Sequence, residues 1–245
     1  MPAIRFRHRL KLNLKKVLDM VNTLNIINSV KLVTNVKGII ESMGVKERRE
    51  REKQQVRQEI LDAARELFIK EGYENVSMRK IAEKIEYSPT TIYIYFDDKA
   101  ELVQNLCEES FVKLVEMFET LGGDLSDPVG ALKKCGRAYI EFGLKYPNDY
   151  KVTFMLNLRP DKDPEEYLRE GSMGMRAYGY LRKIVEECVR QGKFRDADVE
   201  TATQTLWMVV HGATSLLITH ANFPWTDKER LIDFTLEKIT DGLRG

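Results

Sequence analysis

The sequence predicts an all-α protein, with a small three-helix domain towards the N-terminus and a larger helical domain after it. Three observations support this prediction. Apolar residues recur every three or four positions, as they do on one face of a helix. Residues that cap or break helices lie between these segments. No segment alternates apolar and polar residues as an amphipathic strand does, and no tandem repeat occurs.

Composition and length are those of an ordinary globular protein. The 245 residues are 43% apolar and 31% charged, so the chain can bury a core and is not expected to be disordered. No apolar run reaches the about 18 residues of a membrane span. The three cysteines, Cys107, Cys135 and Cys188, lie far apart, which fits a reducing compartment better than a disulfide framework. We therefore expect a cytoplasmic protein that makes no membrane contact.

The net charge of +1 is unevenly distributed along the chain. Residues 1–42 carry +6, residues 43–103 carry −1 and residues 104–245 carry −4. The middle segment, which holds the functional motif, is therefore not basic as a whole. Any binding of nucleic acid must depend on where its individual charged groups sit.

Residues 1–42 differ from the rest of the chain. Six basic side chains lie between Arg5 and Lys16, and a stretch rich in Asn, Val and Ile follows. The segment lacks the apolar core and small-residue cleavage site of a secretory signal. A new pattern begins just after Met43, which favours a non-native extension or an upstream choice of start. A basic arm that touches DNA is the alternative.

The first helix of the small domain is predicted to end at Gly72, a candidate C-cap. Its apolar stripe consists of Ile60, Ala63, Ala64, Leu67 and Phe68. The charged run at residues 46–53 precedes this stripe. We interpret the run as a solvated helical face, with an arm that contacts DNA as the alternative.

Residues 77–96 have the length and punctuation of a helix–turn–helix. Ser77 is a good N-cap for a short helix, and residues 86–88 make a tight connection. Ser88 then caps a second helix, in which Pro89 takes the first position because its missing N–H costs nothing there. A further helix is expected from a cap at Asp98 to about residue 120.

The helix at residues 89–95 carries the residue types that a DNA-reading helix needs. The major groove is about 12 Å wide and admits one helix, whose first turn must approach the base edges closely. Small hydroxyl residues can bond base edges or phosphates, and phenols and basic groups can reach the backbone. The residues expected to contact double-stranded DNA are Ser77, Arg79, Ser88, Pro89, Thr90, Thr91, Tyr93, Tyr95 and Lys99.

Residues 56–103 resemble the N-terminal domain of the tetracycline-repressor (TetR) family. The stretches that carry the resemblance are Ser77–Glu83, Tyr87–Phe96 and Lys99–Leu102. The resemblance places a DNA-binding domain at residues 43–103 and implies that Lys99 holds a backbone phosphate. It also implies a homodimer that binds a palindromic operator and is released by a small effector.

Glu86 departs from the family pattern, which usually has Gly in that turn. We expect strain there if the turn needs a positive φ, and the side chain adds a negative charge close to DNA.

Residues 104–245 are expected to form the domain for effector binding and dimerisation. After the helix that starts at Asp98, the predicted helices cover residues 127–145, 148–157, 165–191, 198–221 and 226–243. The run Trp207–Gly212 resembles a subgroup with a Trp…His-Gly motif. By the same resemblance, the last two helices pair with those of a second copy as a four-helix bundle.

An effector pocket is expected within this domain. An apolar cavity with a few polar tips suits a small hydrophobic effector. The candidate pocket residues are Phe142, Tyr146, Tyr150, Phe154, Met155, Met173, Tyr178, Trp207 and His211. Aromatic and Met residues at helical spacing are usually core, and a structural, hydrogen-bonded role is favoured for His211 over contact with a ligand.

Two other classes of function are weighed against a DNA-binding regulator. The sequence has no HExxH, no diiron pattern, no phosphate loop and no serine elbow, so we expect no enzyme, metal site or cofactor. A regulator-like protein that has lost DNA binding and acts as a ligand-binding module is the second alternative. Glu86 and the lack of net positive charge in the small domain favour it.

Overall fold

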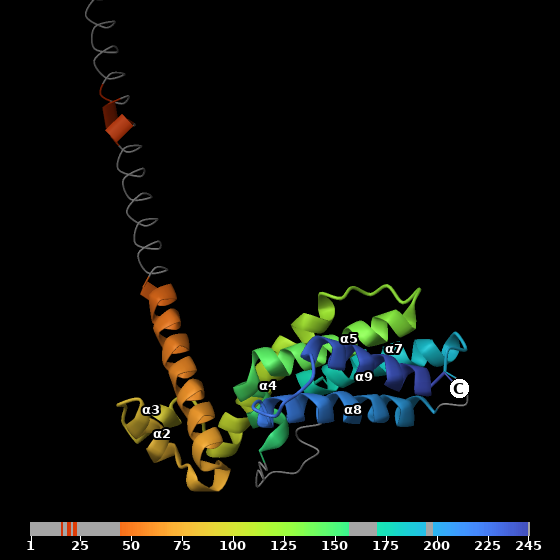
Figure 1. The fold of residues 1–245 in the computed structure, drawn as a ribbon. Helices are drawn as coiled ribbons and strands as arrows, with labels where there is room; N and C mark the ends of the chain where they lie inside the picture. The colour runs from red at the N-terminus through yellow and green to blue at the C-terminus, as the bar shows by residue number, and fades with distance from the viewer. Residues whose placement is uncertain are drawn as a thin grey trace, which may run out of the picture. The chain divides into compact units, whose positions relative to one another are not determined.

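The computed structural model describes residues 16, 19, 20, 22, 23, 45–156, 171–194 and 198–244. The chain divides into two units, Met1–Arg57 and Gln58–Gly245, and Figure 1 draws the described residues as a coloured ribbon. In the first unit, residues 45–57 are helical, and the charged run at residues 46–53 is exposed, as expected for a solvated face. The extension at residues 1–42 lies almost wholly outside the described residues, and so does the expected start of a helix at residue 165.

The second unit is built from helices, and none of its described residues lies in a strand. The all-α prediction is therefore confirmed for the described part of this unit. Its first helix, residues 58–71, ends where expected, because Gly72 takes a φ of 82° and its N–H bonds to the Phe68 carbonyl at 3.0 Å. A short 3₁₀ turn, η1 (Tyr73–Asn75), follows.

The helix–turn–helix consists of α2 (Met78–Lys84) and α3 (Pro89–Tyr93). The predicted caps are confirmed, because the Ser77 hydroxyl accepts from the Lys80 N–H and the Ser88 hydroxyl accepts from the Thr91 N–H, both at 3.2 Å. The α3 helix ends two residues earlier than the predicted residue 95. The apolar core that holds these helices together consists of Ile60, Leu61, Ala64, Phe68, Ile81, Ala82, Ile92 and Phe96.

The α4 helix (Lys99–Glu119) starts at the predicted cap. The Asp98 carboxylate accepts from the Glu101 N–H at 2.7 Å, and the Glu101 carboxylate accepts from the Asp97 N–H at 2.6 Å. This reciprocal pair is close to the expected capping box.

Helix α5 (Pro128–Lys145) lies at the centre of the C-terminal helices and packs against α4, α7 (Met173–Arg190), α8 (Val199–Thr219) and α9 (Lys228–Gly242). The ranges of α5, α8 and α9 agree with the sequence-based ranges to within about two residues at each end, as is usual for helix ends. The predicted helix at residues 148–157 is helical over residues 147–155, but it is not α-helical throughout. It is a four-residue helix, α6 (Pro147–Tyr150), that continues as a π-helix, η2 (Lys151–Met155).

Gly143 on α5 allows a close approach that fixes the position of α6. A Cβ atom there would lie 2.2 Å from Thr214 Cγ2 and 2.9 Å from the Tyr150 ring. Only a residue without a side chain lets α8 and the Tyr150 ring pack directly on the α5 backbone. Tyr150 is consequently fully buried.

Candidate functional site

The outer face of α3 is formed by Thr90, Tyr93 and Ile94, which follow one another at helical spacing. Tyr93 is 53% exposed and Ile94 is 70% exposed, whereas Ile92 on the opposite side is fully buried. The buried residue anchors the helix and leaves its outer face open to a partner. An exposed tyrosine and an exposed isoleucine on so short a helix make a surface suited to contact with DNA bases and sugars.

Ile94 was not among the residues expected to contact DNA. The available signal was its spacing, one residue after Tyr93 and four after Thr90, but an apolar residue is normally assigned to the core. Thr91 and Tyr95 are half-buried, and the Thr91 hydroxyl lies 3.0 Å from that of Ser88. Thr91 thus helps to hold the cap of α3, and its contact with DNA stays a prediction.

The remaining expected DNA contacts lie around α3. Ser77, Ser88 and Pro89 are exposed. Arg79 is exposed and pairs with Glu83 at 3.0 Å. In the turn between α2 and α3, Glu86 has a φ of 60° and is the one residue other than glycine with a positive φ among the described residues. The turn therefore has the conformation for which the departure from Gly predicted strain.

Lys99 has a different environment from the one expected. Its ammonium group donates to the Tyr73 carbonyl at 2.8 Å and to the Val76 carbonyl at 3.0 Å. It also lies 3.9 Å from the centre of the Tyr73 ring. The side chain thus ties η1 to the start of α4, and its contact with a phosphate stays a prediction.

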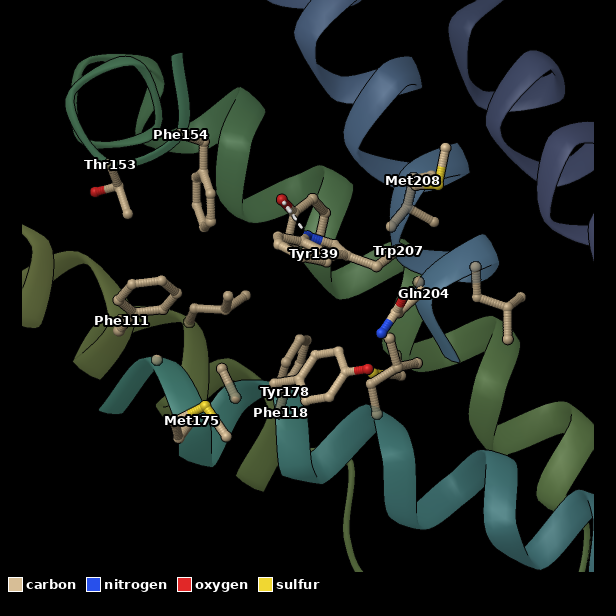
Figure 2. A pocket seen from close by; sticks show the side chains of 18 of the residues that line it. Phe111, Phe118, Tyr139, Thr153, Phe154, Met175, Tyr178, Gln204, Trp207 and Met208 are labelled. Atoms are coloured by element: carbon tan, nitrogen blue, oxygen red, sulfur yellow. Dashed lines mark hydrogen bonds between the residues drawn. The ribbon is translucent and has the colours of Figure 1, made fainter. Parts of the chain in front are cut away.

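A cavity of about 1000 Å³ is lined by residues of α4, α5, α7, α8, α9 and the π-helix η2 (Figure 2). Its wall is mostly apolar. Its aromatic lining consists of Phe111, Phe118, Tyr139, Phe154, Tyr178 and Trp207. Its polar side chains include Gln104, Glu108, Glu200 and Gln204. A cavity of this size and composition can take a largely apolar molecule.

Three of the nine candidate pocket residues line this cavity, namely Phe154, Tyr178 and Trp207. The other six are not among the lining residues of this cavity: Phe142, Tyr146, Tyr150, Met155, Met173 and His211. Phe142 and Tyr150 are fully buried in the helical core instead. Core and cavity wall show the same helical spacing of aromatic residues, so the sequence pattern does not separate them.

The sequence analysis missed the contribution of α4 to the cavity. Phe111 and Phe118 lie on this helix, from which no candidate pocket residue was taken. Tyr139 on α5 and Met175 on α7 were also missed. The apolar spacing of α4 was visible, but nothing in it distinguished a cavity wall from a packed core.

A chain of polar contacts runs behind the cavity wall. The Trp207 indole N–H donates to the Tyr139 hydroxyl at 3.3 Å, which lies 3.2 Å from the Tyr150 hydroxyl. The Tyr150 hydroxyl lies 2.7 Å from Nδ1 of His211. Burial lowers the pKa of His211, which favours the neutral ring. Nδ1 then accepts from Tyr150, and Nε2 faces the Ser215 hydroxyl at 3.4 Å.

Comparison with known families identifies the two helical parts. Residues 60–106 match the model of bacterial regulatory proteins of the tetR family, and residues 132–239 match the model of a tetracyclin repressor-like C-terminal domain. The chain belongs to the TetR family of DNA-binding transcriptional regulators. The all-α class, with an N-terminal helix–turn–helix and a C-terminal helical domain, is that of its structural neighbours.

Curated relatives of this TetR family regulator include two named proteins. One is the HTH-type transcriptional repressor NicS of Pseudomonas putida, 26% identical over 57% of this chain and 66% of that protein. The other is the fatty acid metabolism regulator protein of Bacillus subtilis, 23% identical over 76% of this chain and 94% of that protein.

Solved structures share the fold. The transcriptional regulator FadR from Bacillus subtilis in complex with stearoyl-CoA has a TM-score of 0.64 and 20% identity, and the match covers 76% of this chain and 98% of that one. No helix in the described part of the regulator is long and apolar enough to cross a membrane.

Proposed function

We propose that this regulator represses transcription by binding a palindromic operator as a homodimer, and that a small hydrophobic effector releases it. The observation that carries the proposal is the combination within one compact unit of an exposed α3 face and a large apolar cavity. The proposed DNA-binding domain is residues 43–103 and the proposed effector domain is residues 104–245. Operator binding would place the protein in the cytoplasm.

The effector is proposed to bind in the cavity lined by the six aromatic side chains. The cavity volume of about 1000 Å³ lies at the upper end of the usual range for small-molecule sites. The names of two matched proteins support a hydrophobic ligand, since one is a fatty acid metabolism regulator and one was solved with stearoyl-CoA. The Trp207, His211 and Gly212 run, with Trp207 at the cavity, supports membership of the Trp…His-Gly subgroup.

The second copy is proposed to pack on α8 and α9. Met208 and Leu216 on α8 are 71% and 48% exposed, and Phe234 on α9 is 57% exposed. Gly212 and Ser215 lie between the two α8 residues and would let a facing helix come close. Exposed apolar side chains around small residues favour a buried interface over a solvated surface. The dimer would set the spacing of the two α3 helices near one turn of DNA.

The DNA half of the proposal is tested by selection from a random-sequence duplex pool, followed by footprinting on the winning sequence. We expect a near-palindromic site with two protected half-sites about one helical turn apart. Failure to enrich any sequence would instead favour the ligand-binding module without DNA binding.

The effector half is tested on the selected duplex with a panel of neutral and anionic long-chain compounds that includes stearoyl-CoA. A compound that fits should raise the melting temperature of the free protein and release it from the DNA. A matched variant, Ala177→Trp, would fill the cavity from α7 and should abolish both effects. Effects that persist unchanged in this variant would place the effector elsewhere.

A further inference from the structure

Residues 147–155 connect the cavity to a buried ion-pair cluster. They form one continuous helical segment, α6 followed by the π-helix η2, which we call the 147–155 unit. Near its end the unit supplies Thr153 and Phe154 to the cavity wall. Near its start it supplies Asp149, whose side chain is 8% exposed. A π-helical turn is rare and is frequently found at functional sites.

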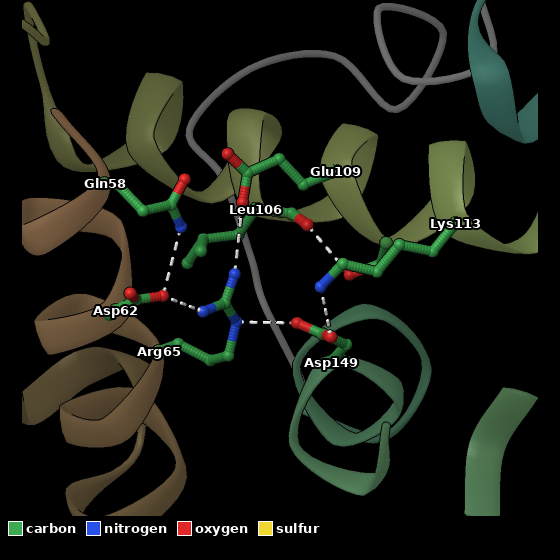
Figure 3. A network of polar contacts seen from close by, with 8 residues as sticks. Gln58, Asp62, Arg65, Leu106, Glu109, Lys113 and Asp149 are labelled. Carbon is green, nitrogen blue, oxygen red and sulfur yellow. Dashed lines mark hydrogen bonds and ion pairs between the residues drawn. The ribbon is translucent and has the colours of Figure 1, made fainter. Parts of the chain in front are cut away.

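Asp149 is the shared partner of two cations (Figure 3). Arg65 Nε lies 2.7 Å from one carboxylate oxygen, and Lys113 Nζ lies 2.6 Å from the other. Arg65 lies in the helical residues 58–71, in the same three-helix domain as α3. Lys113 lies on α4. Asp149 thus joins the helix–turn–helix domain to the effector domain by charge.

Arg65 is held from several sides. Its guanidinium also contacts Glu109 on α4 at 3.1 Å and Asp62 on its own helix, and its side chain is 13% exposed. Among the described residues, however, Arg65 Nε and Asp149 Oδ1 have no hydrogen-bond partner. The contact between the two helical segments is therefore an ion pair without a directed hydrogen bond. This contact can open without leaving either charge unpaired, because Asp149 keeps Lys113 and Arg65 keeps Glu109 and Asp62.

The middle of the unit, Tyr150, contacts a residue of the cavity wall. Tyr150 follows Asp149 directly, is fully buried, and lies against His211 and Tyr139 through its hydroxyl. Its ring also lies 4.9 Å from that of Phe154. A shift of Phe154 or Tyr150 must therefore move the adjacent Asp149, because these residues share one short, tightly packed segment.

We propose that Asp149 and Arg65 are positioning residues that transmit occupancy of the cavity to the DNA-reading domain. A ligand that presses on Thr153 and Phe154 displaces the 147–155 unit and draws the Asp149 carboxylate away from Arg65. The helix–turn–helix domain then loses one of the charges that fix its position. The inference rests on the proposed function, since it describes how the effector acts on the operator-bound state.

The test is a double-mutant cycle measured as affinity for the selected operator duplex. Thr153→Trp places a large side chain in the cavity and stands in for a ligand, and Thr153→Val is its matched control. Asp149→Asn removes the negative charge of the ion pair with Arg65 and keeps the shape of the side chain. We expect Thr153→Trp to weaken operator binding about tenfold, the usual size of an allosteric coupling, and by less than about twofold in the Asp149→Asn background. Asp149→Glu should restore part of the effect.

A purely structural ion pair gives a different result. The two substitutions would then lower the melting temperature, and their effects on DNA affinity would multiply independently. Independent effects, or a Thr153→Trp variant that binds DNA like the wild type, would overturn the inference. If Asp149→Asn does not fold, Arg65→Gln, which removes the other charge of the pair, replaces it in the cycle. A wild-type protein that enriches no DNA would defeat the proposed function itself, and this outcome is seen before any variant is made.

Discussion

At the scale of single residues, the backbone of Glu86 is in a strained conformation, and a substitution can relieve that strain. The residue has a φ of 60°, where a side chain meets the backbone and glycine does not. Glu86→Gly should stabilise the protein by about 1 kcal/mol, measured by urea unfolding. The control is Glu86→Ala, which removes the charge but keeps the strain. Equal stabilisation by both variants would mean that charge, and not backbone strain, dominates.

A second residue-scale prediction concerns pH and His211. Burial lowers its pKa from the ordinary value of 6.5, so the folded protein resists protonation of this ring. As the pH falls below 6.5, the unfolded chain binds the proton more readily, and the free energy of unfolding falls until the lower folded pKa is reached. His211→Asn should therefore lose less stability than the wild type between pH 7.5 and pH 5.5.

The matched control for this pH effect is His220→Asn. His220 is exposed at the end of the same helix, so its replacement removes a histidine that lies outside the buried contacts of Tyr139 and Tyr150. A profile that responds to His220 and not to His211 would contradict the assignment of the neutral ring.

At the scale of an element, substitutions of Lys99 and Arg79 should have different effects within one domain. One should lower stability, and the other should lower the affinity for DNA. Lys99→Met removes two hydrogen bonds to the carbonyls that precede α2, so it should destabilise the protein by about 1.5–3 kcal/mol. Arg79→Met changes a side chain that is 79% exposed, so it should leave the melting temperature unchanged and weaken binding to all duplexes alike. Thermal unfolding and DNA titration of both variants check this. A stable Lys99→Met protein with weakened DNA binding would restore the phosphate role.

The elements differ in how far the sequence predicts them. Caps such as Ser77, Ser88 and Asp98 act through local hydrogen bonds, so they locate helix starts from the sequence alone. Tyr150, the residue before η2, packs against Gly143 and His211, and no local sequence pattern predicts such contacts between distant residues. Most of the cavity lining is missed for the same reason. Whether an aromatic side chain lines the cavity, as Phe111 does, or is buried in the core, as Phe142 is, depends on which helices pack around it. The ion pair between Arg65 and Asp149 likewise joins residues that are far apart in sequence.

At the scale of the whole molecule, the exposed apolar side chains of α8 and α9 predict a dimer. Leu216→Glu would place a charge in the proposed interface and should shift the protein to a monomer in sedimentation. Operator affinity should fall with it, because one copy reaches one half-site. Lys183→Glu, an exposed change on α7, is the control and should stay dimeric. A Leu216→Glu variant that remains a dimer would place the interface elsewhere.

The central claim is sequence-specific DNA binding through the outer face of α3. The most direct measurement is a fluorescence titration of the selected duplex and of a random duplex across a salt series, with the wild type and Tyr93→Ala. The wild type should prefer the selected duplex, with the logarithm of the binding constant falling linearly against that of the salt concentration. Tyr93→Ala should lose about 1–3 kcal/mol of this preference and keep its melting temperature. Equal binding of both duplexes by the wild type at every salt concentration would contradict the claim.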